Sequence, residues 1–360
     1  MPDGSSALRD AARVVVYKGR SAAIRAGRRV RYAYRVARHL AAYRVPHERD
    51  TCPACGGRPL RHLAPLSSSR PLWRFGFISG CVRCGVLFAN PLPSEGDLIE
   101  AYSPEGEWGR HRQEEQEKPV SQARLEAIFA PVRSEFDITH PRRGASVLDL
   151  GCGLGGLLDS LAALGWDTHG IDPATKVAFQ RHRELASIPD HPQFDLVVLH
   201  HVIEHVTDPL AILRQLARAT RDGGFLFLSV PNLDDVAEHG ELKYCLRHKV
   251  HVLAYSAQCL EWLAAAAGFR IVSTSPIPRK PRQRVALARR ESSRPLPSPA
   301  RPLESARAAL DRYYNRHPDD RGPLWASLPV RLRAAYWDLE RARWRIAEKK
   351  RGDGRPSTRR

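Results

Sequence analysis

The chain has 360 residues, 42% of them hydrophobic, which is enough for two domains or for one domain with long extensions. No apolar run approaches the roughly 18 to 20 residues of a membrane-spanning helix, and the apolar run 14–16 is too short for a signal peptide. These features exclude a membrane-spanning protein, and we expect a cytoplasmic location.

The net charge of +18 is unevenly distributed. Residues 1–50 hold 12 Lys and Arg against 4 Asp and Glu, and residues 279–360 hold 23 against 9, whereas residues 51–278 hold 22 against 26. A slightly acidic body disfavours a nucleic-acid groove. Basic flanks suit an anionic membrane surface or an acidic partner. The arginine-rich composition of a GC-rich genome would explain the same excess without any partner.

Residues 1–50 are predicted to form a basic helical extension, because residues 5–45 are rich in Ala, Arg and Val and contain few helix breakers. The apolar stripe along this segment is patchy. A helix lying on an acidic lipid surface and a solvated docking helix are both compatible with it.

Residues 51–104 contain two C-x2-C pairs, each followed by a glycine that leaves the backbone of a tight turn unhindered, and we expect a zinc-binding module here. Four thiolates in a tetrahedral array select zinc, and four protein ligands leave no open position, so the ion would be structural. A redox role and an iron–sulfur cluster are the alternatives. The predicted ligands are Cys52, Cys55, Cys81 and Cys84.

Residues 105–140 are predicted to be a linker with a helix over 121–132 that covers the ligand site of the next domain. That domain begins with a strand at 146–150, a turn containing Gly151, Gly153 and Gly155, and a helix with leucines on one face. A strand, a glycine turn and a helix N-terminus form a cradle for a polar ligand.

Two carboxylates narrow the choice of ligand. Asp172 lies 21 residues after Gly151, at the tip of the next strand, where it can accept hydrogen bonds from both hydroxyls of a ribose. The glycines also fit the dinucleotide fingerprint GxGxxG, which alone is weak evidence. Asp149, at the carboxyl end of the first strand, suits the ammonium group of an amino acid better than a pyrophosphate.

The segment Val147-Leu-Asp-Leu-Gly-Cys-Gly-Leu-Gly155 resembles the first motif, hhDhGCGxG, of the class I methyltransferases that use S-adenosylmethionine (SAM). The resemblance covers roughly residues 145–290. It implies an α/β fold with a Rossmann-like seven-stranded methyltransferase sheet over residues 141–290, here with a small N-terminal zinc-binding module and helical flanks. It also implies SAM as cofactor and a set of cofactor-binding residues: Asp149, Gly151, Gly153, Gly155, Asp172 and Glu184.

Glu184 is the nearest match to the acidic residue that the family often places by the adenine amino group. Only about a dozen residues separate Asp172 from Glu184, so the helix between the second and third strands should be nearly absent.

The segment from Cys81 to Pro93, followed by Tyr102-Ser103, resembles a subgroup of methyltransferases that carry an N-terminal zinc-binding domain and act on deoxysugars. This resemblance implies a sugar or glycan acceptor. Some ribosomal-RNA methyltransferases carry a four-ligand zinc ribbon as well. They resemble this chain less, because its Asn-Pro-Leu-Pro segment and acidic body do not suit them.

The predicted catalytic residues are His251, His205 and Glu204, because a hydroxyl or acidic C–H acceptor needs a base beside the methyl donor. His200, His201 and His248 are further candidates in the same two segments. His251 matches the proposed base of the sugar subgroup, whose adjacent acidic residue is replaced here by Val250, which argues against C-methylation. Alternatively, His251 caps a helix or lines a wall, and Glu204 and His205 only support a local helix.

Residues 291–360 are predicted to be a proline-rich linker followed by a basic helical C-terminal extension, with helices at 303–315 and 328–350. The function favoured by the sequence is SAM-dependent methyl transfer to a sugar or glycan hydroxyl, with the basic flanks placing the protein at the membrane periphery. A non-catalytic SAM-binding scaffold protein and an RNA methyltransferase that uses the basic flanks are the alternatives.

Overall fold

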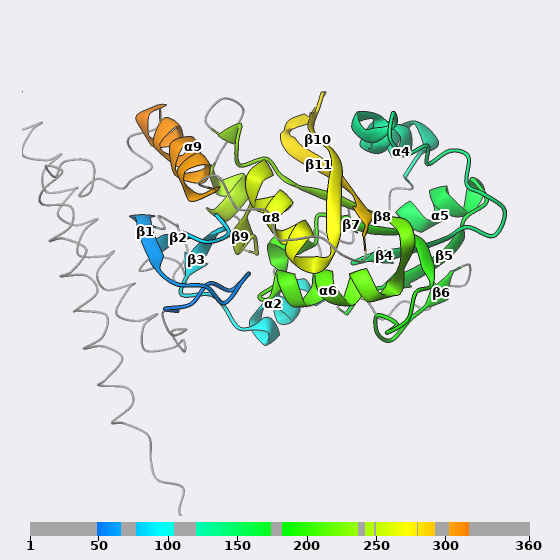
Figure 1. Cartoon of the computed structure of the whole chain (residues 1–360), viewed down its shortest axis with the longest axis horizontal. Helices are drawn as coiled ribbons and strands as arrows, with labels where there is room; N and C mark the ends of the chain where they lie inside the picture. The colour runs from blue at the N-terminus through cyan, green and yellow to red at the C-terminus, as the bar shows by residue number, and fades with distance from the viewer. Residues whose placement is uncertain are drawn as a thin grey trace, which may run out of the picture.

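Two β-sheets and the helices that cover them make up the described part of the chain (Figure 1). The structure is a computed structural model and describes residues 49–65, 77–103, 120–173, 182–236, 242–247, 250–278, 280–291 and 302–316. The predicted helices at 5–45 and 328–350 and the candidate His248 lie outside the described residues. None of the helices within these ranges is long and apolar enough to cross a membrane.

The large sheet has seven strands in the order β10-β11-β8-β7-β4-β5-β6. The five strands from β6 to β8 run parallel, while β11 pairs antiparallel with both β8 and β10. This arrangement confirms the predicted seven-stranded α/β sheet. Its strands are β4 (Ser146–Leu150), β5 (Asp167–Ile171), β6 (Arg183–Glu184), β7 (Phe194–His200), β8 (Thr220–Pro231), β10 (Phe269–Ile277) and β11 (Lys280–Arg290).

Helices cover both faces of this sheet, because consecutive strand residues point to opposite sides. Val147 of β4 packs in one hydrophobic cluster with α4 and α5, whereas Leu148 packs in another with α6 and α8. The helical elements around the sheet are α4 (Gln122–Phe129), η2 (Ala130–Val132), α5 (Gly156–Ala163), η3 (Ile203–His205), α6 (Pro209–Ala219), η4 (Lys243–Arg247) and α8 (Ala257–Ala267).

Polar caps fix where three of these helices begin. The side chains of Ser121, Asp208 and Ser256 each accept a hydrogen bond from a backbone N–H in the first turn of α4, α6 and α8. The predicted helix over 121–132 is therefore confirmed, with α4 forming its first part and η2 its last turn.

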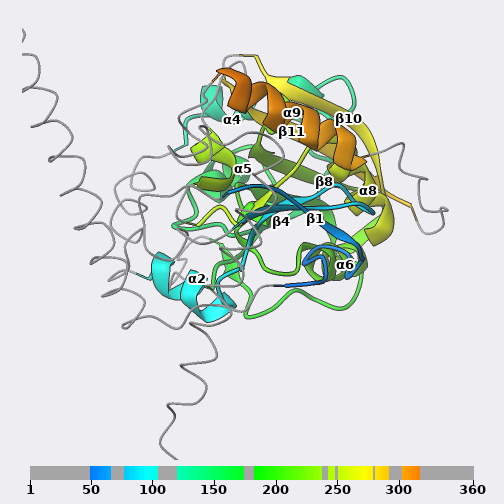
Figure 2. The same cartoon turned by 90° about the vertical axis from the view of Figure 1, so that its left-hand side faces the viewer.

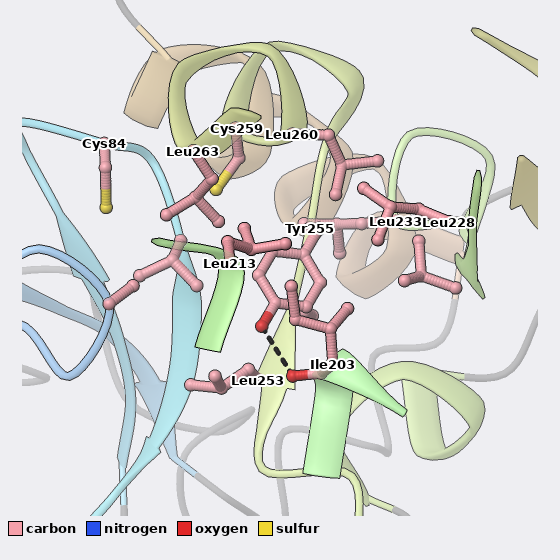
Figure 3. Packing of buried hydrophobic residues seen from close by; sticks show 14 of the residues in the cluster. Cys84, Ile203, Leu213, Leu228, Leu233, Leu253, Tyr255, Cys259, Leu260 and Leu263 are labelled. Carbon is pink, nitrogen blue, oxygen red and sulfur yellow. Dashed lines mark hydrogen bonds between the residues drawn. The ribbon is translucent and has the colours of Figure 1, made fainter. Parts of the chain in front are cut away.

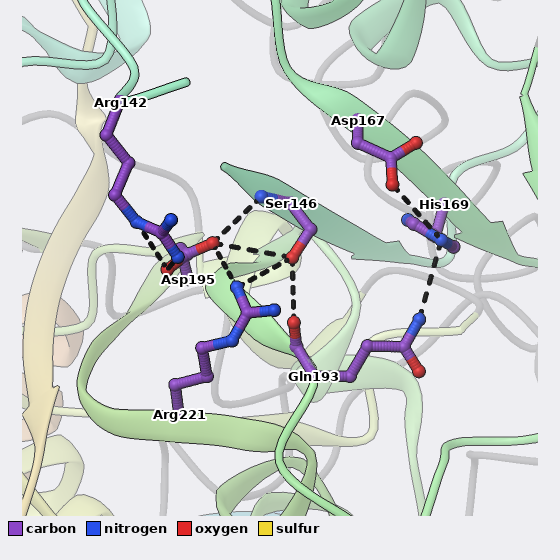
Figure 4. A network of polar contacts seen from close by, with 7 residues as sticks. All are labelled: Arg142, Ser146, Asp167, His169, Gln193, Asp195 and Arg221. Carbon is purple, nitrogen blue, oxygen red and sulfur yellow. Dashed lines mark hydrogen bonds and ion pairs between the residues drawn. The ribbon is translucent and has the colours of Figure 1, made fainter. Parts of the chain in front are cut away.

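A network of charged side chains holds the amino end of the large sheet (Figure 4). The Asp195 carboxylate accepts hydrogen bonds from the Ser146 backbone N–H at 2.9 Å and from Arg142 and Arg221, both at 2.5 Å. These interactions tie β4 to β7 at the edge opposite the glycine turn. The carboxyl edge, where open parallel sheets bind ligands, is left for the functional site.

The small sheet joins the cysteine-containing segment to the rest of the chain. Its order is β1-β2-β3-β9, and β9 (Leu253–Ala254) lies far along the chain from β3 (Leu87–Asn90). Leu87 pairs with Ala254, and the Ala89 N–H donates to the Val252 carbonyl at 3.0 Å. The sheet therefore continues across the predicted module boundary at residue 104. Its other elements are β1 (Leu60–Pro65), β2 (Phe77–Cys81) and the helix α2 (Glu95–Tyr102) that follows it.

Helix α9 (Pro302–Arg316) matches the predicted helix at 303–315 and lies beside the small sheet and α8 (Figures 1 and 2). Leu303 comes so close to β2 that a Cβ added at Gly80 would lie 2.4 Å from Leu303 Cδ1. Part of the predicted C-terminal extension thus belongs to the hydrophobic core. Its buried residues are Ala306, Ala309, Leu310, Tyr313 and Tyr314.

Candidate functional site

The glycine turn after β4 is the predicted cradle, with Gly151 half-buried and Gly153 and Gly155 buried. Gly151, Gly153 and Gly155 all have positive φ angles, between 58° and 84°, which favour glycine. The Gly151 N–H donates to the Ile171 carbonyl at 2.7 Å. A Cβ added at Gly151 would lie 2.5 Å from Val202 Cγ2, so the turn packs directly against the segment that leads into η3.

Asp149 and Asp172 lie on either side of this turn. The Gly153 N–H donates to Asp172 Oδ2 at 2.8 Å, which orients the carboxylate at the tip of β5. Asp149 is buried, and burial together with the nearby Asp172 carboxylate raises the pKa of Asp149 to about 8. A buried carboxyl with a raised pKa lacks a compensating cation, and an ammonium group from a ligand would supply one.

Glu184 is exposed on β6, where its backbone pairs with Gly170. Residues 174–181 lie outside the described ranges, so the length of the helix between β5 and β6 stays a prediction. The role of Glu184 at the adenine stays a prediction as well.

The second group of site residues is a cluster of one carboxylate and three imidazoles, formed by His201, Glu204, His205 and His251. Glu204 is completely buried, and its Oε1 lies 3.0 Å from His201 Nδ1 and 3.8 Å from His205 Nε2. The rings of His205 and His251 meet edge to face with centroids 4.6 Å apart. The fold thus brings together histidines that the sequence places in two separate segments.

Backbone hydrogen bonds hold the two segments of the cluster against each other. The Val252 N–H donates to the Glu204 carbonyl at 2.9 Å. The Tyr255 hydroxyl donates to the Ile203 carbonyl at 2.8 Å from within a buried apolar cluster (Figure 3). Because β9 lies between these two contacts, the small sheet and the cluster share one piece of backbone.

The four predicted metal ligands converge as expected. Their sulfur atoms all lie within 4.8 Å of one another, with Cys52 Sγ and Cys55 Sγ each 3.6 Å from a sulfur of the other pair. Four thiolates around a zinc ion at about 2.3 Å would lie roughly 3.8 Å apart. The backbone N–H groups of Gly56 and Gly85 close the two turns at 2.9 Å. This geometry fits a tetrahedral zinc ion.

Residues 120–274 match the family model described as "Methyltransferase domain". The match begins at α4 and spans the glycine turn and the histidine cluster. This segment is a methyltransferase domain, and the sheet to which it contributes has the α/β methyltransferase fold.

Curated relatives resemble this domain over part of their length. A "Ubiquinone biosynthesis O-methyltransferase" from Albidiferax ferrireducens is 37% identical over 121 residues, which is 28% of this chain and 48% of that protein. A protein of the same name from Xanthomonas euvesicatoria pv. vesicatoria is 40% identical over 119 residues, covering 28% and 50%. The chain therefore spans about half the length of the curated relatives it matches.

Solved structures show only a distant likeness. The 1,6-didemethyltoxoflavin-N1-methyltransferase of Burkholderia thailandensis, with bound 1,6-didemethyltoxoflavin and S-adenosylhomocysteine, is 17% identical. It covers 57% of this chain and 96% of its own, with a TM-score of 0.41.

Two features of the methyltransferase domain site are absent from the sequence prediction. The hydroxyl of Tyr102, at the end of α2, lies 2.8 Å from His205 Nδ1. His201 has a positive φ of 57°, a conformation that is uncommon outside glycine, although histidine adopts it more often than most residues do. A local sequence pattern carries no signal for a tyrosine that reaches the cluster from another segment, and the left-handed backbone at His201 is visible only in the fold. His200, beside it, has a lowered pKa because of burial and the neighbouring His201.

Proposed function

We propose that the chain transfers the methyl group of SAM to a hydroxyl oxygen. The contact between Gly151 and Val202 is the observation that carries this proposal. It sets the cofactor turn against the short segment that ends in Glu204 and His205. A methyl donor in the cradle would thus lie beside groups that can take a proton from an acceptor.

The residues around the turn fit SAM. Asp149 would pair with the ammonium group of its amino acid moiety, and Asp172 would accept hydrogen bonds from the ribose hydroxyls. The three glycines hold the turn in a conformation that other residues rarely adopt, and this turn lies between the two carboxylates. SAM, when bound, supplies the electrophilic methyl group, and the protein contributes chiefly by positioning the acceptor in line with it.

His251 is the proposed base on the acceptor side. Its Nδ1 lies 2.5 Å from the Tyr244 carbonyl, which can only accept a hydrogen bond, so the proton resides on Nδ1 and the lone pair on Nε2. His205 and Glu204 adjoin it and would hold the acceptor or the imidazole in place. The absence of an acid at Val250 favours oxygen over carbon as the methyl acceptor.

Two acceptor classes follow from different observations. The resemblance of the zinc module to that of sugar methyltransferases favours a sugar or glycan hydroxyl. The names of the curated relatives favour a hydroxylated precursor of ubiquinone. We propose the glycan hydroxyl first, because the cysteine-containing sheet is joined to the site through β9.

The test is methyl transfer from labelled SAM by the full chain. Nucleotide sugars, lipid-linked glycans and hydroxylated ubiquinone precursors serve as acceptors, with RNA as a further arm. We expect a labelled methyl ether on one of the first two classes. Transfer to RNA, or SAM binding without transfer to any class, would support the RNA methyltransferase or the non-catalytic alternative instead.

Variants assign the roles on the acceptor side. His251→Ala should leave SAM affinity unchanged and lower turnover by ~10² to 10⁴, the usual contribution of general acid–base catalysis. His205→Ala is the matched variant. If it abolishes turnover while His251→Ala does not, then His205 is the base.

Zinc and the basic flanks complete the proposal. We propose that Cys52, Cys55, Cys81 and Cys84 hold one structural zinc ion, which elemental analysis of anaerobically purified protein would detect. The net positive charge of residues 1–50 and 279–360 suits an anionic membrane surface or an acidic partner. Salt-sensitive co-sedimentation with anionic vesicles tests the membrane version, and absent or salt-insensitive binding would end it.

A further inference from the structure

The carboxylate of Glu204 is completely buried, and only one of its two oxygens is hydrogen-bonded within the described residues. Its Oε1 accepts a hydrogen bond from His201 Nδ1 at 3.0 Å, but its Oε2 has no hydrogen-bond partner among the described residues. Burying a carboxylate is costly unless it is paired, so this position calls for a positive charge. No Lys or Arg side chain in the described ranges forms an ion pair with Glu204, whose contacts there are imidazoles.

The tautomers of His205 and His251 point to the kind of cation. His205 Nδ1 lies 2.9 Å from the Val250 carbonyl and His251 Nδ1 lies 2.5 Å from the Tyr244 carbonyl. A carbonyl only accepts, so each ring carries its proton on Nδ1 and its lone pair on Nε2. A histidine whose Nδ1–H donates to a backbone carbonyl while Nε2 carries a lone pair is arranged as metal-binding histidines are. The Tyr102 hydroxyl lies 3.3 Å from His205 Nε2 and would move aside when an ion binds there.

The donor atoms also converge. One ligand atom from each of Glu204, His205 and His251 lies within 4.8 Å of the others, and His205 Nε2 is 3.8 Å from Glu204 Oε1. Two ligands at about 2.0 to 2.1 Å from one tetrahedral ion lie roughly 3.4 Å apart. The side chains would have to move closer together to bind one ion.

We propose that Glu204, His205 and His251 bind a divalent transition-metal cation, separate from the ion of the cysteine cluster. Two imidazoles and one carboxylate suit zinc, iron, cobalt or manganese, and three protein ligands leave open positions. An oxygen ligand from the methyl acceptor would occupy one of them, and a bound cation lowers the pKa of such a hydroxyl. This inference deepens the proposed function, because it assigns the acceptor side of the site to a cation instead of to a free base.

The experiment is a cobalt titration of the full chain after zinc has filled the cysteine cluster, with zinc content measured first. Calorimetry and visible absorption report the binding. We expect one further Co²⁺ per chain, with ligand-field bands but without the intense thiolate-to-cobalt absorption that the cysteine cluster would produce. Glu204→Gln and His251→Ala should each weaken this binding by more than the ~10- to 100-fold caused by the loss of a group that only hydrogen-bonds to a metal ligand.

His182→Ala is the matched control, because His182 also contacts a carboxylate, Asp159, at 3.0 Å but lies outside the three-ligand cluster. It should bind the second Co²⁺ as the wild type does. SAM affinity, measured on each variant, verifies that the fold is intact. If a variant fails to fold, His251→Asn is the substitute.

A wild-type chain that binds no Co²⁺ beyond the cysteine cluster would overturn the proposal. Equal second-site binding by wild type, Glu204→Gln and His251→Ala would overturn it as well. The measurement requires no acceptor and no methyl transfer. Its failure therefore leaves the proposed methyltransferase function standing, and the reverse also holds.

Discussion

The hydroxyl of Tyr102 lies 2.8 Å from His205 Nδ1, and the two rings meet edge to face with centroids 5.3 Å apart. Tyr102 ends α2, in the cysteine-containing segment, whereas His205 belongs to η3 of the methyltransferase domain. Since the Val250 carbonyl requires a proton on Nδ1, the same N–H donates to the carbonyl and to the tyrosine oxygen. The cysteine-containing segment thus helps to orient a predicted catalytic residue.

Tyr102→Phe removes one of these two acceptors and keeps the ring. We expect turnover to fall by roughly threefold to tenfold, the equivalent of one ordinary hydrogen bond, while SAM affinity and zinc content stay unchanged. Steady-state kinetics with calorimetry and elemental analysis measure the three quantities. Tyr313→Phe, on α9, is the control. A loss of zinc in Tyr102→Phe would mean that the tyrosine supports the module and not the histidine.

Asp172→Ala removes both the predicted partner of the ribose hydroxyls and the acceptor of the Gly153 N–H. Hydrogen bonds to a charged group contribute about 1.5 to 3 kcal/mol, so SAM affinity should fall by about 10- to 150-fold. Calorimetric titration measures the change. Asp190→Ala, which removes only a surface partner of Arg218, should bind SAM normally. Equal affinity of wild type and Asp172→Ala would rule out the ribose assignment.

The pH dependence of SAM binding should reflect Asp149, whose pKa is about 8 in the ligand-free protein. An ammonium group prefers the carboxylate form, so SAM binding at pH 7 should release a proton from this carboxyl. Affinity should therefore rise by about tenfold for each unit by which the pH is raised towards 8. Calorimetry in two buffers of different ionisation enthalpy measures the number of protons released when SAM binds. Asp149→Asn should abolish this proton release. No proton release from the wild type would contradict the assignment.

The same shift predicts the stability of the ligand-free protein. The folded-state pKa lies above the unfolded value of about 3.9, so the folded state binds the proton more tightly. The contribution of Asp149 to the free energy of unfolding is therefore fully present below pH 4 and is lost as the pH rises towards 8. In urea denaturation across this pH range, the free energy of unfolding of the wild type should fall as the pH rises, and that of Asp149→Asn should lack this fall.

Loss of the metal from the cysteine cluster should affect the histidine cluster as well. Cys81→Ser should lower zinc content and weaken β3, and β3 pairs with β9 next to His251. Hydrogen exchange should accelerate across residues 250–256, while the glycine turn at 151–155 keeps its protection. Cys245→Ala, which changes a buried cysteine outside the cluster, is the control. Unchanged exchange at 250–256 after zinc loss would show that the two clusters are independent.

The sequence predicted the parts of the fold that local patterns encode. β4 spans the predicted residues, because an apolar strand that is followed by glycines has a clear end in the sequence, and Asp172 follows the end of β5 as predicted. The cysteine pairs converge as predicted, because C-x2-C spacing is itself a local geometry. The seven-stranded α/β sheet followed from the family resemblance and is confirmed.

The rest depends on contacts between distant segments. β9 has only two residues, which is too few for an alternating apolar pattern to predict a strand. Its partner β3 also lies in another part of the chain. Tyr102 reaches His205 only because this pairing brings the small sheet to the large one. Likewise, the lack of a hydrogen-bond partner for Glu204 Oε2 among the described residues can be recognised only from the folded structure.

The two-residue strand β9 also constrains how the protein folds during synthesis. The small sheet begins near the N-terminus, but its last strand leaves the ribosome only after most of the methyltransferase domain has been made. Until then, β3 exposes an unpaired edge, the kind of surface on which nascent chains associate wrongly. Metal bound early by the four cysteines would hold β1, β2 and β3 together through that interval. The zinc ion would then stabilise the unfinished small sheet during translation, before any substrate is bound.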